Sequence, residues 1–130
     1  EVYVASASLT GSGAGTPGTA IDFVLSAPAD GALPYQMGSS LGNGPIPIDT
    51  RRLELSLDAL LTLSVTGVLP AVFQNYAGVL DAQGAAKAAL AIPNQPALKG
   101  VRIYTAFVTL LAAAPSGLAS ISNSFLFTIQ

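Results

Sequence analysis

Apolar and polar residues alternate with a period of two along much of the chain, which is typical of β-strands. The longest such segment, residues 101–111, is rich in β-branched and aromatic residues and contains neither Pro nor Gly. It carries apolar side chains on both of its faces. Because a strand of this kind is usually covered on both sides, we predict that residues 101–111 form the central strand of the fold.

Shorter alternating segments before and after this one predict the remaining strands. Turns rich in Gly and Pro separate them at intervals of about 8 to 12 residues, the spacing found in β-sandwiches. The predicted strands cover residues 1–9, 20–26, 35–39, 52–56, 72–80, 85–92 and 120–129. We therefore predict one domain, residues 1–130, with an all-β fold: an immunoglobulin-like two-sheet sandwich of about eight strands.

Several connecting segments have their own signals. Residues 11–18 contain alternating glycines and a Thr-Pro-Gly turn, so we expect a Gly-rich hinge there. Two prolines predict an irregular structure for residues 42–47, since Pro cannot donate to a sheet ladder. Residues 81–84 form a turn that would join the flanking strands into a hairpin. In residues 57–63, Asp58 can cap a helix, for which we expect one turn at most.

The low content of charged residues changes this picture. Only 9% of the residues are charged, against roughly 25% in an ordinary soluble domain. Hydrophobic residues make up 51% of the chain. The apolar run at residues 103–114 is well short of the ~20 residues that span a membrane. We therefore predict that the chain does not span a membrane and that neighbouring molecules cover part of its apolar surface.

The composition also argues against several kinds of chemistry. The chain has no Cys and no His, which removes thiol chemistry and the commonest general base and metal ligand. Its net charge is −2 and it has no basic run that could neutralise a phosphate backbone. The acidic residues are scattered along the chain. We predict a protein that is not an enzyme and that has no cofactor, no metal site and no nucleic-acid partner.

Two short motifs match known sites only in part. Residues 38–42, Gly-Ser-Ser-Leu-Gly, fit the G-x-S-x-G pattern of hydrolase nucleophiles. Prolines follow where that site needs a helix, and no His is available to accept the serine proton. The glycines of residues 11–15 lack the spacing of a phosphate-binding loop. Glu54 and Asp58 could form a carboxylate pair, but two neighbouring arginines favour a solvated ion cluster.

Several stretches of the second half together resemble a known module. They are residues 78–84, 90–100 and 103–107 and the pair Ser122-Asn123, with a looser fit at residues 27–28 and 35–39. The module is a β-sandwich that recurs, often at the C-terminus, in large secreted and cell-surface proteins of environmental bacteria. The resemblance implies a non-catalytic module located outside the cell or on its surface, and it supplies no site residues. The chain begins in a strand-like segment without the pattern of a signal peptide, as we expect of a mature or excised module.

The first ten residues are the candidate for association between copies of the chain. Residues 1–10 contain no Pro and precede the predicted hinge at residues 11–18, so they could leave their own domain and add a strand to a neighbour's sheet. The side chains that would fill apolar pockets of the neighbour are Val2, Tyr3, Val4 and Leu9. Head-to-tail contacts of this kind give filaments unless a rotation closes them. The sequence therefore predicts a structural subunit that self-assembles into a filament or surface layer.

Two alternatives stay open at this point. Residues 1–10 could instead form the first strand of their own sandwich. The protein could also be an accessory adhesion or carbohydrate-binding module of a secreted protein, with glycans as its partners. Sugar-binding modules stack sugars on exposed aromatic side chains, and the chain has no Trp. Its plausible platforms are Tyr3, Tyr35 and Tyr76.

Overall fold

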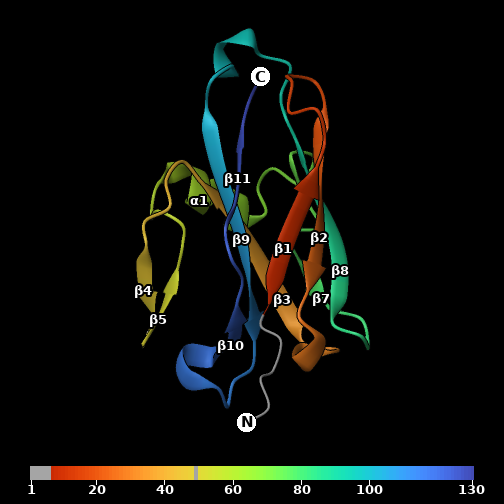
Figure 1. The fold of residues 1–130 in the computed structure, drawn as a ribbon, viewed down its shortest axis with the longest axis vertical. Coiled ribbons are helices and arrows are strands. Elements are labelled where there is room, and N and C mark those ends of the chain that lie inside the picture. Colours follow the sequence, from red (N-terminus) through yellow and green to blue (C-terminus); the bar gives the residue numbers. More distant parts are fainter. Residues whose placement is uncertain (1–6, 49) are drawn as a thin grey trace.

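Two facing antiparallel sheets make up most of the structure, a computed structural model that describes residues 7–48 and 50–130 (Figure 1). The first sheet has the strand order β1 (Ser8–Ser12), β2 (Ala20–Ser26), β8 (Ala85–Ala91) and β6 (Phe73–Gln74). The second has the order β10 (Leu118–Ile121), β9 (Arg102–Leu110), β3 (Pro34–Ser40) and β7 (Ala77–Val79), and β11 (Phe125–Thr128) also pairs with β9. This arrangement confirms the predicted all-β, immunoglobulin-like two-sheet sandwich.

The remaining elements lie outside the two sheets. β4 (Ile46–Ile48) and β5 (Arg51–Leu53) pair with each other as a two-stranded ribbon. The α-helix α1 (Ala59–Thr66) packs beside β3, and short 3-10 turns occupy Pro28–Asp30, Pro96–Leu98 and Pro115–Gly117. The described residues thus contain eleven strands, more than the eight or so predicted, because predicted strands are divided and the ribbon adds another.

β9 is the central strand of its sheet, as its two apolar faces predict. It pairs with β3 on one side and with β10 and β11 on the other. Phe107 faces the core between the two sheets, and Ala106 faces Leu55 and Leu61 beneath α1. Both faces of β9 are therefore covered, one by the opposite sheet and the other by the helix and its preceding segment.

The core between the sheets follows the alternation of the strands. On β2 the inward residues Ile21, Phe23 and Leu25 are buried, as predicted, and Asp22 and Val24 between them are exposed. Met37 of β3 and Phe107 of β9 meet them from the opposite sheet. Full burial of each such large side chain is worth roughly 1.5–3 kcal/mol, so this core supplies most of the favourable energy of the fold.

Residues 72–80 do not form the single strand that we predict from the sequence. β6 pairs with β8 in the first sheet, whereas β7 pairs with β3 in the second. Between them Asn75 has a φ of 58°, in the left-handed region that Asn tolerates better than most residues. The chain changes sheets at this point, so the turn at residues 81–84 connects the two sheets and does not close a simple hairpin.

The predicted strand at residues 120–129 is also divided, into β10 and β11 along the same edge of β9. Ser122, between the two, keeps a bond to β9 because its Oγ accepts from the Phe107 N–H at 2.9 Å. Asn123 instead turns its side chain to the first sheet. Its Oδ1 accepts from the Leu9 N–H at 2.9 Å, and its Nδ2 donates to the Leu9 carbonyl at 3.1 Å. We call this pair of bonds the Asn123 clasp, since it joins the edges of the two sheets.

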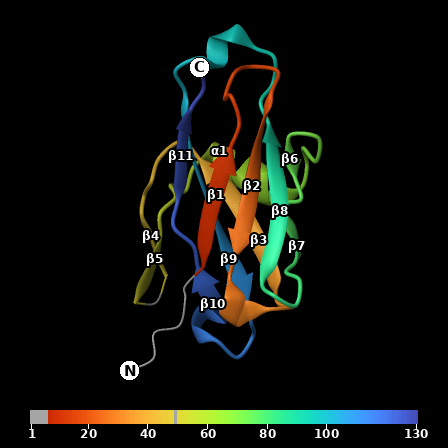
Figure 2. The same ribbon diagram turned by 45° about the vertical axis from the view of Figure 1, so that its right-hand side comes forward.

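β1 and β11 lie side by side on this edge of the sandwich (Figures 1 and 2). The ring of Phe125 on β11 packs against Gly11 of β1, where a Cβ would lie only 2.8 Å from a ring carbon. The same ring makes an edge-to-face contact with Phe23, with centroids 5.8 Å apart. β1 begins toward the lower end of the molecule in Figure 1, and β11 ends toward the upper end.

α1 is longer than the single turn that the sequence predicts. Asp58 caps it as expected, since its Oδ1 accepts from the Leu61 N–H at 3.0 Å, and the helix ends at Gly67, which has a φ of 75°. The other carboxylate oxygen of Asp58 accepts from the Leu41 N–H at 2.9 Å. The helix lies against β3 at Gly38, where a Cβ would meet the Leu61 side chain at 2.6 Å. Gly38 therefore allows α1 to pack closely on the sheet.

Residues 42–45 are irregular, as predicted, whereas residues 46 and 47 belong to the ribbon. Pro47 lies in β4, opposite Arg52 of β5. Each strand of a two-stranded ribbon pairs along only one edge, so a Pro, which has no backbone N–H, is tolerated there. Arg51 ties the ribbon to the sandwich, because its guanidinium donates to the carbonyls of Leu118 and Ala119 at 2.8 and 3.1 Å. The ribbon is thus held against β10 by a side chain and not by a sheet ladder.

Candidate functional site

The residues predicted to mediate assembly fall into two groups. Val2, Tyr3 and Val4 lie outside the described residues. Leu9 lies in β1, is only 2% exposed and belongs to the core of its own domain. In this chain Leu9 also carries the backbone groups that the Asn123 clasp binds. Leu9 therefore packs within its own sandwich.

The predicted hinge at residues 11–18 begins inside a strand. Gly11 and Ser12 belong to β1 and lie opposite Phe23 and Asp22 of β2. The Gly at position 11 serves the close packing of Phe125 and does not loosen the chain. Residues 13–18 connect β1 to β2, and the Gln130 N–H donates to the Gly15 carbonyl at 2.9 Å.

The motif at residues 38–42 lies at the end of a strand and not on a strand-to-helix elbow. Gly38, Ser39 and Ser40 belong to β3, and both serines are fully buried. The Ser40 Oγ donates to the Gly42 carbonyl at 2.6 Å and accepts from the Ser56 N–H at 2.9 Å. The hydroxyl of Ser40 thus closes a turn, a structural role.

The acidic residues and tyrosines considered as candidate sites have structural surroundings as well. Asp58 caps α1, and no three acidic side chains within residues 7–48 and 50–130 approach closely enough to hold a metal ion. Tyr35 and Tyr76 are both buried, and the Tyr35 hydroxyl donates to the Asn75 carbonyl at 2.7 Å. Neither ring presents a face on which a sugar could stack, which removes two of the three predicted platforms.

A buried network of hydroxyl groups joins α1 to the sheets. The Ser39 Oγ lies 2.8 Å from the Tyr76 hydroxyl and 2.7 Å from the Thr105 Oγ1, and the Ser39 N–H donates to the Ser64 Oγ at 2.9 Å. Burial raises the pKa of Tyr76 to about 12, although hydrogen bonds to Ser39 and Thr105 partly lower it. A tyrosine with such a pKa stays protonated at neutral pH, so we interpret the network as structural.

An exposed apolar face surrounds α1. We define the α1 face as the large apolar residues on and beside the helix that remain exposed: Leu41, Leu57, Leu63, Val65, Val68 and Leu69. Leu57 is 83% exposed and Val68 is 61% exposed. Leu41, Leu63 and Leu69 line one cleft together, and a cluster of exposed apolar residues on a soluble domain often marks an interaction site. The composition predicted a covered apolar surface but did not locate it, although the chain has no charged residue between Asp58 and Asp81.

A cleft of about 210 Å³ opens at the edge of this face. All thirteen residues that line it are apolar. They come from α1 and the segment after it (Leu60, Leu69, Phe73) and from the ends of β8 and β9 and the C-terminal residues (Ile92, Ile103, Ile129). The cleft thus lies between the two sheets, at the end of the sandwich where β9 begins. We refer to it as the apolar cleft.

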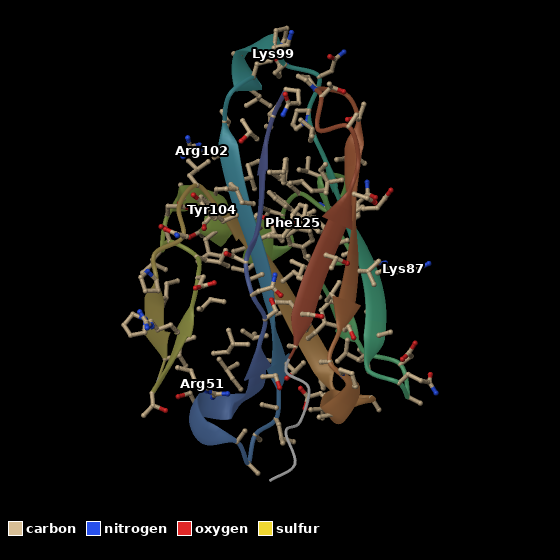
Figure 3. All side chains as sticks on the ribbon, viewed as in Figure 1. Arg51, Lys87, Lys99, Arg102, Tyr104 and Phe125 are labelled. Atoms are coloured by element: carbon tan, nitrogen blue, oxygen red, sulfur yellow. The ribbon has the colours of Figure 1, made fainter. Side chains whose placement is uncertain are left out.

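The charged side chains are dispersed over the molecule. Figure 3 shows the cationic residues Arg51, Lys87, Lys99 and Arg102 on separate parts of it. These four residues do not form a basic patch. In addition, the described part of the chain contains no helix with the length and hydropathy needed to cross a membrane. The surface around α1 is therefore the most distinctive feature of the exterior.

Fold and surface together define the class of protein: an all-β two-sheet sandwich with an exposed apolar face beside its helix. Comparison with known proteins does not narrow this class, because neither a protein-family model nor a curated protein matches the chain. The resemblance to modules of secreted bacterial proteins, drawn from short stretches of sequence, stays a prediction.

Proposed function

We propose that the protein is a non-catalytic extracellular structural subunit that associates with copies of itself, in a filament or surface layer. The observation that carries this proposal is the α1 face. Several large aliphatic side chains are exposed together there, on a chain in which only 9% of the residues are charged. Covering such a surface removes apolar area from water, which is the main driving force of association.

The location outside the cell rests on the resemblance to modules of secreted and cell-surface proteins. Lack of catalysis is supported by the structural roles of the polar groups considered as candidates, Ser40 and Tyr76 among them. Both are buried and hydrogen-bonded to neighbouring groups of the fold. These two polar groups thus help to hold the sandwich together.

The alternative, an adhesion or carbohydrate-binding module, has less support. Tyr35 and Tyr76 are buried, and Tyr3 is the one predicted platform that lies outside the described residues. A glycan array tests this alternative directly. Specific binding of a sugar would favour it over self-association as the main role.

A charge placed on the α1 face tests the proposal. In Val68→Lys, association must bury an ammonium group, so we expect the concentration at which oligomers form to rise at least severalfold. The matched control is Val24→Lys, because Val24 is 46% exposed on the outer face of β2, away from α1. The measurement is sedimentation velocity over a range of protein concentrations, with negative-stain imaging of the larger species.

Two results would contradict the proposal. The unmodified protein could remain monomeric at the highest concentration reached, which would leave the α1 face without a self-partner. Alternatively, Val68→Lys and Val24→Lys could weaken association equally, which would show that added charge acts through overall repulsion and not through the α1 face.

A further inference from the structure

The apolar cleft is too small and too uniformly apolar for a polar metabolite. Small-molecule sites usually combine apolar walls with a few polar groups that fix the orientation of the ligand, and none of the lining residues here is polar. An apolar cavity of roughly 150 Å³ accepts a molecule of the size of benzene. A cleft of about 210 Å³ therefore matches one or two apolar side chains of a protein partner.

We propose that the apolar cleft of one copy receives residues 1–6 of a second copy, an inference that rests on the proposed self-association. This segment reads Glu-Val-Tyr-Val-Ala-Ser and presents two Val side chains and one Tyr side chain to fill the cleft. Its one charged side chain is the Glu1 carboxylate. Lys99 is exposed and directly follows Leu98, a residue of the cleft wall, so its ammonium group is available to pair with that carboxylate.

The geometry requires that the segment come from another copy. The described chain begins at Ala7, which is 5% exposed and directly precedes β1. Ser8 lies opposite Ser26, which lies opposite Ala85, the first residue of β8. The cleft is at the other end of β8, where Ile92 lines it, about 20 Å farther along the strand.

Six residues reach about 20 Å when fully extended. The cleft is also displaced sideways from β1, because its wall on the first sheet comes from β8 and β6, and β8 is two strand spacings or roughly 10 Å from β1. Residues 1–6 therefore cannot fill the cleft of their own chain. A segment that leaves one end of a copy and enters a cleft at the opposite end of the next gives a head-to-tail contact, which propagates as an open filament unless it closes into a ring.

Site-directed cross-linking tests this contact cleanly because the chain contains no Cys. One preparation carries Tyr3→Cys and a second carries Leu69→Cys at the mouth of the cleft. After mixing and treatment with a flexible bis-maleimide, we expect a product that joins position 3 of one copy to position 69 of the other, identified by mass spectrometry. The matched control is Val24→Cys, since Leu69 is 41% exposed and Val24 is 46% exposed.

The expected result is a yield with Leu69→Cys severalfold above that with Val24→Cys. An added peptide of residues 1–6 should lower this yield, and the same peptide with Ser in place of Val2, Tyr3 and Val4 should not. Equal yields at the two positions would overturn the proposal. So would a predominant product between two copies of Leu69→Cys, because it would indicate that two α1 faces meet symmetrically.

The test separates this inference from the proposed function. If sedimentation shows oligomers that are weakened by Val68→Lys while the position 3 to position 69 product is absent, the cleft inference fails and self-association stands. If the unmodified protein stays monomeric at all concentrations, self-association itself fails.

Discussion

Two polar side chains, Asn123 and Tyr76, close the sandwich along its two long sides. Asn123 joins the edge strands β1 and β11 with two hydrogen bonds to the backbone of Leu9. Tyr76 lies on the opposite side, where the chain crosses from β6 to β7, and its hydroxyl lies within hydrogen-bonding distance of the buried Ser39 Oγ. Both contacts join residues far apart in the sequence, which is why no local pattern predicts them.

We expect Asn123→Ala to lower the free energy of unfolding by about 1–2 kcal/mol, because it leaves the backbone N–H and carbonyl of the buried Leu9 without their partner. Urea denaturation followed by circular dichroism measures the change. The control is Asn94→Ala, at an exposed position in the loop after β8, for which we expect little change. An equal effect of the two substitutions would show that the Asn123 clasp does not stabilise the fold.

Tyr76 makes the stability depend on alkaline pH. Its pKa is about 12 in the folded protein, above the value of about 10 in an unfolded chain, so folding favours the protonated hydroxyl. Its contribution is complete below pH 10 or so and is lost as the pH rises toward about 12. The loss amounts to roughly 2–3 kcal/mol at the upper end of this range.

Urea denaturation at a series of pH values from about 8 to 11.5 tests this dependence in the unmodified protein and in Tyr76→Phe. The Phe variant has no hydroxyl to titrate at this position, so its stability should fall less steeply above pH 10. Burial also raises the pKa of Tyr35, which remains in both proteins and contributes equally to them. Parallel curves would contradict the role assigned to Tyr76.

At the scale of single elements, the sequence predicted a strand correctly where the local pattern of apolar residues matches the way in which the strand packs. Residues 101–111 have two apolar faces, and β9 is indeed central and covered on both sides. Residues 72–80 were also predicted to form one strand, but their sequence does not show that the chain changes sheets at Asn75. The one local signal was Asn itself, a residue that tolerates the left-handed conformation observed there.

The length of α1 was underestimated for a related reason. In residues 61–66 apolar and polar residues alternate with a period of two, as in a strand, so the spacing typical of an amphipathic helix is missing. Asp58 and Gly67 mark the two ends, as N-cap and left-handed C-cap, and together would have indicated two turns. Lack of a polar side on this helix is also what leaves the α1 face exposed.

Asp58 makes two contacts, one with the Leu61 N–H at the start of α1 and one with the Leu41 N–H before the helix. Two substitutions distinguish the contributions of these contacts. Asp58→Ala removes the cap and the acceptor for the Leu41 N–H, so we expect a loss of about 1–2 kcal/mol. Asp58→Asn keeps one carbonyl oxygen for the cap and should lose less. Urea denaturation measures both, with Asp22→Ala on the exposed side of β2 as the control. Equal losses for the Ala and Asn variants would show that the cap contributes nothing.

At the scale of the whole molecule, the composition predicts that copies of the protein associate. It does not indicate which part of the surface they would use. Few charges on a largely apolar chain imply a covered exterior, and that inference does not depend on the fold. The position of the apolar surface does depend on the fold, because Leu57 and Val68 can be recognised as exposed only once α1 is placed on β3. The sequence pointed to the strand-like first ten residues, and the structure adds a surface and a cleft that such a segment could occupy.

The direction of the first and last strands has a mechanical consequence. β1 begins in the lower half of the molecule and β11 ends in the upper half (Figure 1). A pull on the two ends of the described chain would therefore load β1 against β2, and β11 against β9, in shear. Under shear the hydrogen bonds of a strand pair resist the force together, whereas peeling a strand away breaks them one after another. Tension applied along the molecule would meet the sandwich in its stiffest direction.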